Sequence, residues 1–381
     1  MRVAIVGCGY VANFYLKTLP LYPEIELLGV MDIDGSVATK FAQYFAIPHQ
    51  YQTLDEVLND VRVELVVNLT NPRTHYAVSK ACLEAGKHVY SEKPLAMSFA
   101  DAKALVELAE QKGLLISSAP SRVLAETAQT MWKALRENAI GTPYLTYAEM
   151  DDGLVHQMPY QKWINELGTP WPYKDEFETG CTLEHGGYVL TLLTAFFGPV
   201  ESVAAMASAR IPEKIPGVPI EPNAPDFSVA CLKFASGHMA RVTCSIVAPP
   251  DHSIRIFGSH GTLYTHDIWE PRANVYVKRS VKIRQRSVNL PWGRKVPMVG
   301  PEASLARAQV RRLKNKKVDF CLGIVEMIQA IHDKRPCRLS PRYCLHHDEI
   351  VFAMHHASET GSVHRMTTTI EPMVPMDWAK S

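Results

Sequence analysis

The sequence has no uninterrupted apolar run near the roughly 20 residues that a helix needs to cross a bilayer, so we expect no membrane span. It also lacks an excess of either charge. Its 40 Lys and Arg against 39 Asp and Glu give a formal net charge of +1. Charge therefore provides no general attraction to nucleic acid or to an anionic membrane. Because an apolar strand pattern starts at residue 2, we expect no signal peptide.

The eight cysteines contain no Cys-x-x-Cys pair and no regular framework of the kind that disulfide-rich secreted proteins show. We therefore expect reduced, mostly buried thiols and a cytoplasmic protein. The histidine doublets at 346–347 and 355–356 point to different faces of an expected helix, so we expect no metal site. Internal repeats and low-complexity segments are missing as well. These absences favour a globular enzyme that handles a small molecule.

A chain of 381 residues is long for one core, and its hydrophobic pattern divides it in two. Residues 1–122 alternate short apolar strands with helical stretches, which predicts an α/β Rossmann domain with a doubly wound parallel sheet. The expected strands are Val3–Val6, Leu27–Met31, Leu65–Leu69, His88–Tyr90 and Leu114–Ser117. The expected helices are Ser36–Phe45, Leu54–Leu58, Thr74–Ala85 and Phe99–Lys112.

Residues 123–381 show the alternating pattern of antiparallel strands, which predicts an α+β domain with a large, mainly antiparallel open sheet. Its expected strands are Tyr144–Glu149, Val203–Ala209, Phe227–Phe234, Ala240–Ile246, Ser253–Phe257 and Asn274–Lys278, with turns at 235–238 and 259–262. Helices are expected at Ala125–Asn138 and Leu183–Phe197. Two final helices, near Asp319–Asp333 and Tyr343–Glu359, are expected to pack back on the sheet or on the first domain.

The first strand runs into a Gly-x-Gly-x-x-Ala turn formed by Gly7, Gly9 and Ala12. This spacing favours dinucleotide binding. The first glycine permits a tight turn, the second lets the backbone approach a pyrophosphate, and Ala12 keeps the next helix close to the strand. Asp32, at the end of the second strand, can accept hydrogen bonds from both ribose hydroxyls. Its charge repels a 2′-phosphate and Ile33-Asp34 offer no compensating cation, so we expect NAD rather than NADP.

Two further motifs follow in the first domain: Asn71-Pro72-Arg73-Thr74-His75, and Glu92-Lys93-Pro94 at the end of a strand. With the glycine turn, and with Gly258-Ser259-His260-Gly261-Thr262 later on, the chain resembles the Gfo/Idh/MocA family, the glucose–fructose oxidoreductase and inositol dehydrogenase group. The resemblance covers nearly the whole chain. It implies an NAD-dependent oxidoreductase that assembles as a homodimer or homotetramer through the second-domain sheet.

The resemblance also implies which residues meet the cofactor and the substrate. Lys93 would lie beside the nicotinamide and the reacting carbon, Pro94 would follow a cis bond, and Glu92 would fix the lysine or the cofactor. The alternative is a solvent-exposed Lys93 with no catalytic role. The expected cofactor-binding residues are Gly7, Gly9, Tyr10, Val11, Ala12, Asp32, Thr70, Asn71, Pro72, His75, Glu92, Lys93 and Pro94.

The chain departs from the family where an Asp, a His and a second Asp usually bind and deprotonate the substrate alcohol. Glu184, Tyr188 and Thr191 take those places. Their spacing of i, i+4 and i+7 still puts them on one helix face, so they can share a substrate site with Lys93. Tyr188 becomes the expected proton carrier and Glu184 an orienting group. Two alternatives stay open: Tyr188 packs on the sheet while Lys93 acts alone, or His185 is the acid/base.

Between the expected strand and this helix, Met150–His156 leads into Tyr160, Trp163, Trp171, Tyr173 and Phe177. Aromatic faces beside carboxylates suit sugars and cyclic polyols, although a structural lid or a dimer contact explains them too. Residues 271–317 hold fourteen Lys or Arg against Glu302 alone, densest at 311–317. This run could attract a phosphorylated or nucleotide-linked sugar, or it is a solvated face.

Together these features predict an NAD(H)-dependent oxidoreductase that interconverts a secondary alcohol and a ketone on a sugar, amino-sugar, nucleotide-sugar or cyclitol. Lys93, with Tyr188, would transfer the proton. Two alternatives use the same scaffold: a dihydrodiol dehydrogenase or imine reductase, and a non-catalytic NAD-binding regulator.

Overall fold

The structure is a computed structural model that describes residues 1–283, 286–301 and 318–380. The chain forms two compact units. The first comprises residues 1–121, 159–176 and 319–349, and the second 122–158, 177–318 and 350–381. The first unit thus takes two later segments of the chain in addition to the stretch before residue 122. In the described part of the chain, no helix is long and apolar enough to cross a membrane.

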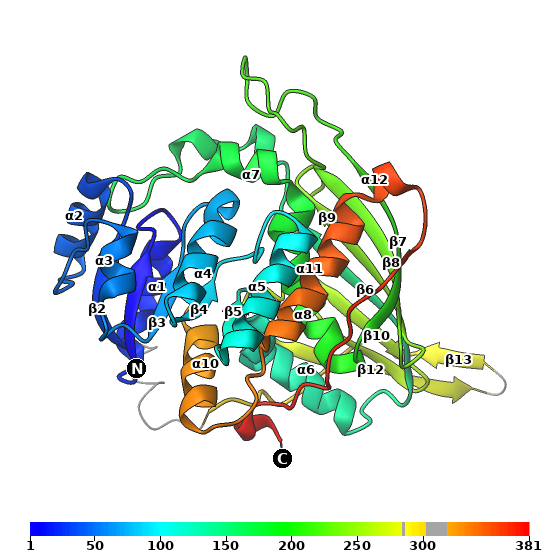
Figure 1. The fold of residues 1–381 in the computed structure, drawn as a ribbon. Coiled ribbons are helices and arrows are strands. Elements are labelled where there is room, and N and C mark those ends of the chain that lie inside the picture. The colour runs from blue at the N-terminus through cyan, green and yellow to red at the C-terminus, as the bar shows by residue number, and fades with distance from the viewer. Residues whose placement is uncertain (284–285, 302–317, 381) are drawn as a thin grey trace. The chain divides into compact units, whose positions relative to one another are not determined.

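The first unit is built on a five-stranded parallel sheet with the order β2-β1-β3-β4-β5, labelled in Figure 1. Four of these strands lose nearly all solvent contact along most of their length, as expected for a parallel sheet covered on both faces. The strands are β1 (Arg2–Val6), β2 (Glu26–Met31), β3 (Leu65–Asn68), β4 (His88–Ser91) and β5 (Ile116–Ser118).

Helices connect these strands in the right order for a doubly wound fold. Asp34, Thr53 and Ser98 each cap a helix by accepting backbone N–H groups from its first turn. The helices are α1 (Ala12–Thr18), α2 (Gly35–Tyr44), α3 (Leu54–Asn59), α4 (His75–Glu84) and α5 (Phe99–Lys112). The late segment adds α10 (Leu322–His332), which packs on β4 and β5, and the start of α11 (Pro341–His355).

The second unit holds a ten-stranded sheet with the order β13-β12-β11-β10-β6-β9-β8-β7-β15, and β14 pairs with β12. Its pairs are antiparallel except for β6 with β9, which run parallel. The strands are β6 (Pro143–Asp151), β7 (Val200–Ser208), β8 (Phe227–Phe234), β9 (Met239–Ser245), β10 (Ile254–Gly258), β11 (Gly261–Thr265), β12 (Val275–Ile283), β13 (Arg286–Asn289), β14 (Arg294–Lys295) and β15 (His364–Arg365).

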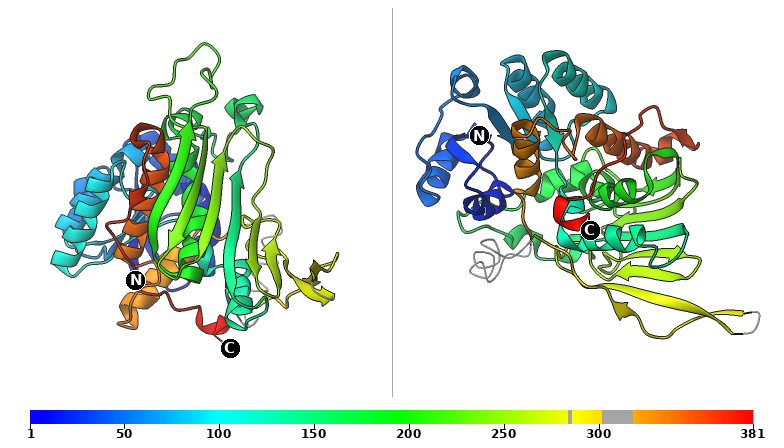
Figure 2. Two further views of the ribbon diagram at one scale, coloured as in Figure 1. Left: turned by 90° about the vertical axis from the view of Figure 1, so that its right-hand side faces the viewer. Right: turned by 90° about the horizontal axis from the view of Figure 1, so that it is seen from below.

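One face of this sheet is buried beneath α8 (Cys181–Phe197), which packs on β6, β8 and β9. Side chains of the buried face alternate with those of the other face, which the left view of Figure 2 presents toward the viewer. The remaining helices are α6 (Glu126–Arg136), α7 (Tyr173–Thr179), which starts in the first unit, and α12 (Ala357–Thr360).

The predicted fold class is confirmed, and most predicted elements lie within two or three residues of the observed ones. Four strands of the large sheet were missed: β11 and the short β13, β14 and β15. Gly261–Thr265 was expected to be partly a turn, but it forms β11, with Leu263 in the core. The glycine at the start of β11 indicates a turn in the sequence. Pairing with β10 on one side and β12 on the other nevertheless holds the segment in an extended conformation.

Candidate active site

The glycine turn after β1 has the geometry that a dinucleotide requires. Gly7 has a φ of +98°, and a Cβ there would lie 2.5 Å from the Leu69 carbonyl oxygen, so no other residue fits. A Cβ at Gly9 would meet nothing within 4 Å, which leaves the backbone open to an approaching ligand. The local geometry is thus that of a tight turn at Gly7 and an open backbone at Gly9, and the cofactor contacts of both glycines stay a prediction.

Asp32 is fixed at the end of β2 by backbone contacts. Its Oδ2 accepts the Cys8 N–H at 2.7 Å, and its Oδ1 accepts the Asp34 N–H at 2.9 Å. The carboxylate is therefore tied to the glycine turn and held beside it. A pyrophosphate at the turn and a ribose at Asp32 are the two contacts that the residues present fit.

The Asn71–His75 and Glu92–Pro94 motifs meet through His75, which is fully buried. Its Nδ1 lies 2.7 Å from the Pro94 carbonyl oxygen and its Nε2 lies 3.0 Å from the Thr70 carbonyl oxygen. Burial lowers the pKa of His75, and a neutral imidazole has one N–H to donate. Only one of the two carbonyl oxygens can therefore accept a hydrogen bond from the neutral ring, which lies packed between the two turns.

Further hydrogen bonds hold the turn that carries Lys93. Glu92 is buried and accepts the Tyr15 hydroxyl at 2.7 Å through Oε1, and the Lys93 N–H at 3.2 Å through Oε2. The Lys93–Pro94 peptide is cis. From α11, Asp348 accepts the Leu95 N–H at 3.2 Å. Sequence reasoning missed Asp348, because nothing local connects a helix residue so late in the chain to this turn.

In the second unit, α8 presents the predicted substrate residues. Glu184 and Thr191 are buried, and Tyr188 is half-buried with its ring 4.2 Å from that of Trp269. The Thr191 hydroxyl donates to the Tyr188 carbonyl oxygen at 3.2 Å, a bond within the helix itself. Thr191 thus has a local acceptor at the place where the family usually has a carboxylate.

The same helix brings His185 to Asp152, which lies just past the end of β6. The His185 Nδ1 is 2.8 Å from Asp152 Oδ2, and the His252 Nε2 is 2.5 Å from Asp152 Oδ1. Burial alone would raise the pKa of Asp152, but the two histidines lower it below its usual range. Sequence reasoning considered Asp152 and His185 separately and gave no sign of His252.

The aromatic stretch between β6 and α8 packs largely on itself. Tyr160 contacts Trp171 and Tyr173, and Trp163 contacts Trp171 with ring centroids 4.9 Å apart. Within the first unit, Glu166 accepts a hydrogen bond from Asn13 at 2.8 Å and pairs with Lys17 on α1. These contacts favour the structural alternative for the aromatic residues.

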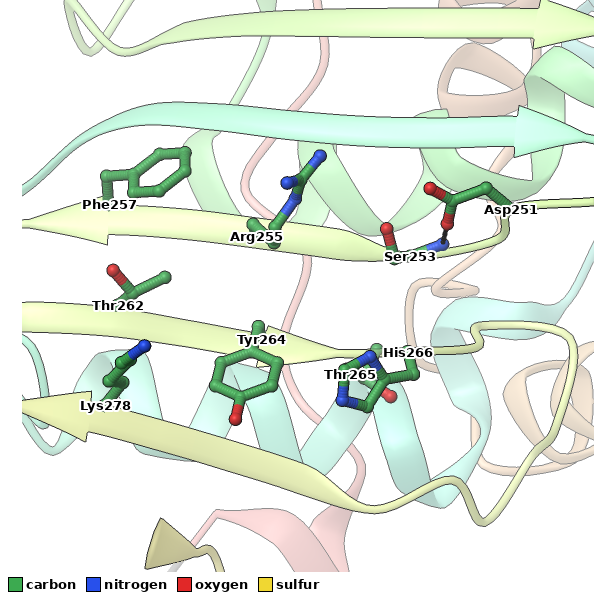
Figure 3. Close-up of a pocket in the computed structure, with 9 residues that line it drawn as sticks. All are labelled: Asp251, Ser253, Arg255, Phe257, Thr262, Tyr264, Thr265, His266 and Lys278. Atoms are coloured by element: carbon green, nitrogen blue, oxygen red, sulfur yellow. Dashed lines mark hydrogen bonds between the residues drawn. The ribbon is translucent and has the colours of Figure 1, made fainter. Parts of the chain in front are cut away.

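The open face of the large sheet contains a cavity of about 510 Å³, drawn in Figure 3. It is lined by Asp251, Ser253, Arg255, Phe257, Thr262, Tyr264, Thr265, His266 and Lys278. None of the residues predicted to be catalytic lines it. The densest part of the basic run, 311–317, lies outside the described residues. Among the residues that are described, no group of three or more His, Cys, Asp or Glu is placed to hold a metal ion.

Two family models match the chain. Residues 1–119 match the model described as an oxidoreductase family with an NAD-binding Rossmann fold, and residues 128–264 match the GFO/IDH/MocA C-terminal domain. The first match accounts for the glycine turn, Asp32 and the Glu92–Pro94 motif, and the second for the large sheet as far as β11.

Among curated proteins, the trans-1,2-dihydrobenzene-1,2-diol dehydrogenase of Mus musculus is 27% identical over 71% of this chain and 76% of its own. The myo-inositol 2-dehydrogenase of Thermotoga maritima is 22% identical over the same shares. A solved levoglucosan dehydrogenase, in complex with NADH and L-sorbose, is similar in fold with a TM-score of 0.76 at 17% identity, covering 97% of this chain and 99% of its own.

Proposed function

The chain belongs to the Gfo/Idh/MocA family of NAD-binding oxidoreductases, and on that premise we propose that it interconverts a secondary alcohol and a ketone on a sugar-like or cyclic polyol substrate. Bound NAD would accept the hydrogen that leaves the substrate carbon together with its electron pair. The observation that carries the proposal is the turn at Lys93, which Glu92, His75 and Asp348 contact in the same unit as the glycine turn.

Lys93 is our first proton-transfer residue. The backbone on both sides of it is held by Glu92 and Asp348, so the side chain starts from a fixed position at this strand end. Ligands of open α/β sheets bind at this edge. A second proton-transfer group is assigned to α8, where Tyr188 and His185 both lie. Glu184 is assigned the role of orienting the substrate.

Dihydrodiols are the second substrate class. The dihydrodiol dehydrogenase of Mus musculus matches 71% of this chain, and the inositol dehydrogenase of Thermotoga maritima does so too. Both names describe a ring that carries hydroxyl groups. We therefore propose a cyclic substrate with neighbouring hydroxyls, and a panel for testing that includes both classes.

The experiment compares Lys93→Met with the wild type. Turnover of NAD+ with trans-1,2-dihydrobenzene-1,2-diol, myo-inositol and scyllo-inositol, and of NADH with their ketones, is followed at 340 nm. Loss of the lysine should lower kcat at least about 100-fold, as removal of a proton-transfer group does. NADH binding, read by fluorescence, should change little. Lys103→Met, at an exposed lysine on α5, is the matched control.

A protein that binds NADH tightly but turns over none of these compounds, with or without Lys93, would be a cofactor-binding regulator instead. A Lys93→Met variant with wild-type kcat would show that Lys93 does not transfer the proton, although the protein would still be an oxidoreductase.

We also propose a homo-oligomer formed through the open face of the large sheet. That face carries Met206, Tyr147, Phe257 and Tyr264, and Met206 is 73% exposed. A reducing, cytoplasmic setting is proposed as well: all eight cysteines lie in the described part of the chain, and none forms a disulfide.

A further inference from the structure

Residues 163–171 form a small loop that closes on itself. Its two ends meet where the Trp171 N–H donates to the Trp163 carbonyl oxygen at 2.8 Å, and the two indole rings lie 4.9 Å apart. Nearer its tip, the Asn165 N–H donates to the Thr169 carbonyl oxygen at 2.9 Å, and the Asn165 Oδ1 accepts the Thr169 N–H at 2.9 Å. These bonds make the loop, which we call the strap, a preformed piece of structure.

The strap belongs to the first unit, and Glu166 at its tip attaches it to α1. The Glu166 carboxylate accepts a hydrogen bond from the Asn13 Nδ2 at 2.8 Å through Oε2, and its Oε1 pairs with the Lys17 ammonium. Asn13 and Lys17 are four residues apart, so they lie on the same face of the helix. One carboxylate thus bridges two successive turns of α1.

This contact lies next to the glycine turn. Asn13 directly follows Ala12, the last residue of the Gly-x-Gly-x-x-Ala pattern. Burial chiefly raises the pKa of Tyr10, inside the turn, and the negative charge of Glu166 raises it further, so the carboxylate is near the turn as well as the helix. A Rossmann fold binds the pyrophosphate of its cofactor at this turn. The strap is therefore beside the cofactor site of its own unit.

Two buried amide atoms close to the contact have no hydrogen-bond partner within the described part of the chain. They are the Oδ1 of Asn13, whose residue is only 1% exposed, and the Nδ2 of Asn165, the neighbour of Glu166. Buried polar atoms are ordinarily paired with protein, water or ligand. A dinucleotide carries both hydroxyl donors and phosphate acceptors, so it is a ligand that suits an acceptor and a donor left in this way.

The ion pair also sets the charge that the strap presents to the cofactor. Glu166 alone would bring a negative charge toward the phosphates, whereas Lys17 neutralises it. The Lys17 hydrogen bond chiefly lowers the pKa of Glu166 to about 2, so the acid stays ionised at neutral pH. Salt nevertheless screens the pair, because the Glu166 side chain is 52% exposed.

We infer that the strap retains the cofactor, and that Glu166 is a positioning residue that latches the strap to α1 and slows the release of NAD(H). The inference goes beyond the proposed reaction. It needs NAD binding by the first unit, but neither a catalytic Lys93 nor any particular substrate. When Glu166 leaves Asn13 and Lys17, the strap swings away from the glycine turn and the cofactor departs.

The first test follows the release of NADH by stopped-flow fluorescence, with excess NAD+ as the competitor. Glu166→Gln should release NADH about two- to fivefold faster than the wild type, the range that an exposed ion pair allows. High salt should accelerate release from the wild type more than from this variant. Glu107→Gln, which removes an exposed ion pair with Lys103 on α5 of the same unit, is the matched control and should release NADH as the wild type does.

The second test exchanges the two charges. Lys17→Glu places two carboxylates together beside the phosphates, so it should accelerate release more than Glu166→Gln does. The double variant Lys17→Glu/Glu166→Lys restores an oppositely charged pair and should return the release rate to within about twofold of the wild type. A pair that served only the stability of the fold would show no such rescue in the release rate. Circular dichroism checks that each variant is folded.

The outcomes separate this inference from the proposed function. Wild-type release rates in Glu166→Gln and Lys17→Glu, or a double variant as fast as Lys17→Glu, overturn the inference and leave the oxidoreductase in place. A protein that shows the expected release rates but turns over none of the probe substrates supports the inference and overturns the proposed reaction alone. A wild type that does not bind NADH overturns both.

Discussion

Asp348 connects a single ionisation to the turn that carries Lys93. It is buried, and this burial raises the pKa of its carboxyl to about 8, although the Leu95 N–H opposes the rise. Between the ordinary pKa of Asp and about pH 8, the carboxyl of Asp348 is therefore protonated in the folded protein and ionised in the unfolded chain. Stability is therefore fully present at acid pH and is lost as the pH rises toward 8.

We predict that Asp348→Asn flattens this dependence. Between pH 4.5 and 7.5 the free energy of unfolding of the wild type should fall, relative to the variant, by about 1.4 kcal/mol per pH unit. Urea unfolding at several pH values measures it. Asp55→Asn, at an exposed acid on α3, should keep the wild-type slope. Parallel curves for Asp348→Asn and wild type would contradict the prediction.

Still at the scale of residues, the sequence could predict those parts of the site whose residues lie close together in the chain. Gly7, Gly9 and Asp32 belong to one strand–turn–helix–strand unit, so their spacing alone indicated their roles. Asp152, His185 and His252 meet through three segments that share no pattern, and only the sheet brings them together. No residue type or spacing near His252 marks it for a site.

At the scale of elements, the exposed side chain of Glu166 connects the segment 159–176 to α1. Glu166 accepts from Asn13 and pairs with Lys17, and the Lys17 hydrogen bond chiefly lowers the pKa of Glu166 to about 2. Burial chiefly raises the pKa of Tyr10, and the negative charge of Glu166 raises it further. The ionised pair contributes above the ordinary Glu pKa and is lost as the pH falls toward 2.

We predict that Glu166→Gln loosens this segment. Trypsin cleavage after Lys162 or Lys174 should accelerate up to about fivefold, since an exposed pair contributes at most about 1 kcal/mol. High salt should produce a similar acceleration in the wild type. Lys17→Met should match Glu166→Gln, and the double variant should add nothing further. Additive effects would show that the two side chains act separately.

Elements with strong patterns were predicted well, and those held by their neighbours were not. Phe227–Phe234 was predicted with the bounds of β8, because polar and apolar residues alternate through it. β11 was missed because its glycine and threonine read as a turn, while pairing on both edges makes it a strand. The parallel pairing of β6 and β9 has no sequence signal, since it depends on the order in which strands join the sheet.

At the scale of the whole molecule, the open face of the large sheet is the surface through which we propose that the homo-oligomer forms. Tyr147 lies against Arg241 and Arg255, both of which contact Glu149, while Phe257 and Tyr264 lie on the neighbouring strands. Such a mixture of aromatic rings and arginine is typical of the centre of a protein interface.

We predict that the wild type is a dimer or tetramer by light scattering, with an interface of about 800 Å² per partner. Phe257→Asp should give a monomer with unchanged NADH binding. Val61→Asp, at an exposed residue of the first unit, should leave the mass unchanged. A monomeric wild type would contradict the prediction.

The order of synthesis gives the three-segment composition of the first unit a further consequence. All five strands of its sheet have left the ribosome once residue 118 has emerged, yet Phe320, which packs on Phe14 and Tyr15, is made much later. Until then these rings and Tyr90, against which Gly323 packs, lack part of their cover. We therefore expect the nascent first unit to expose apolar surface, and a chain stopped before residue 319 to be cleaved by proteases faster than the full chain. The turn at Lys93 gains its hydrogen bond to Asp348 only when α11 has been made, so it is among the last parts of the protein to be completed.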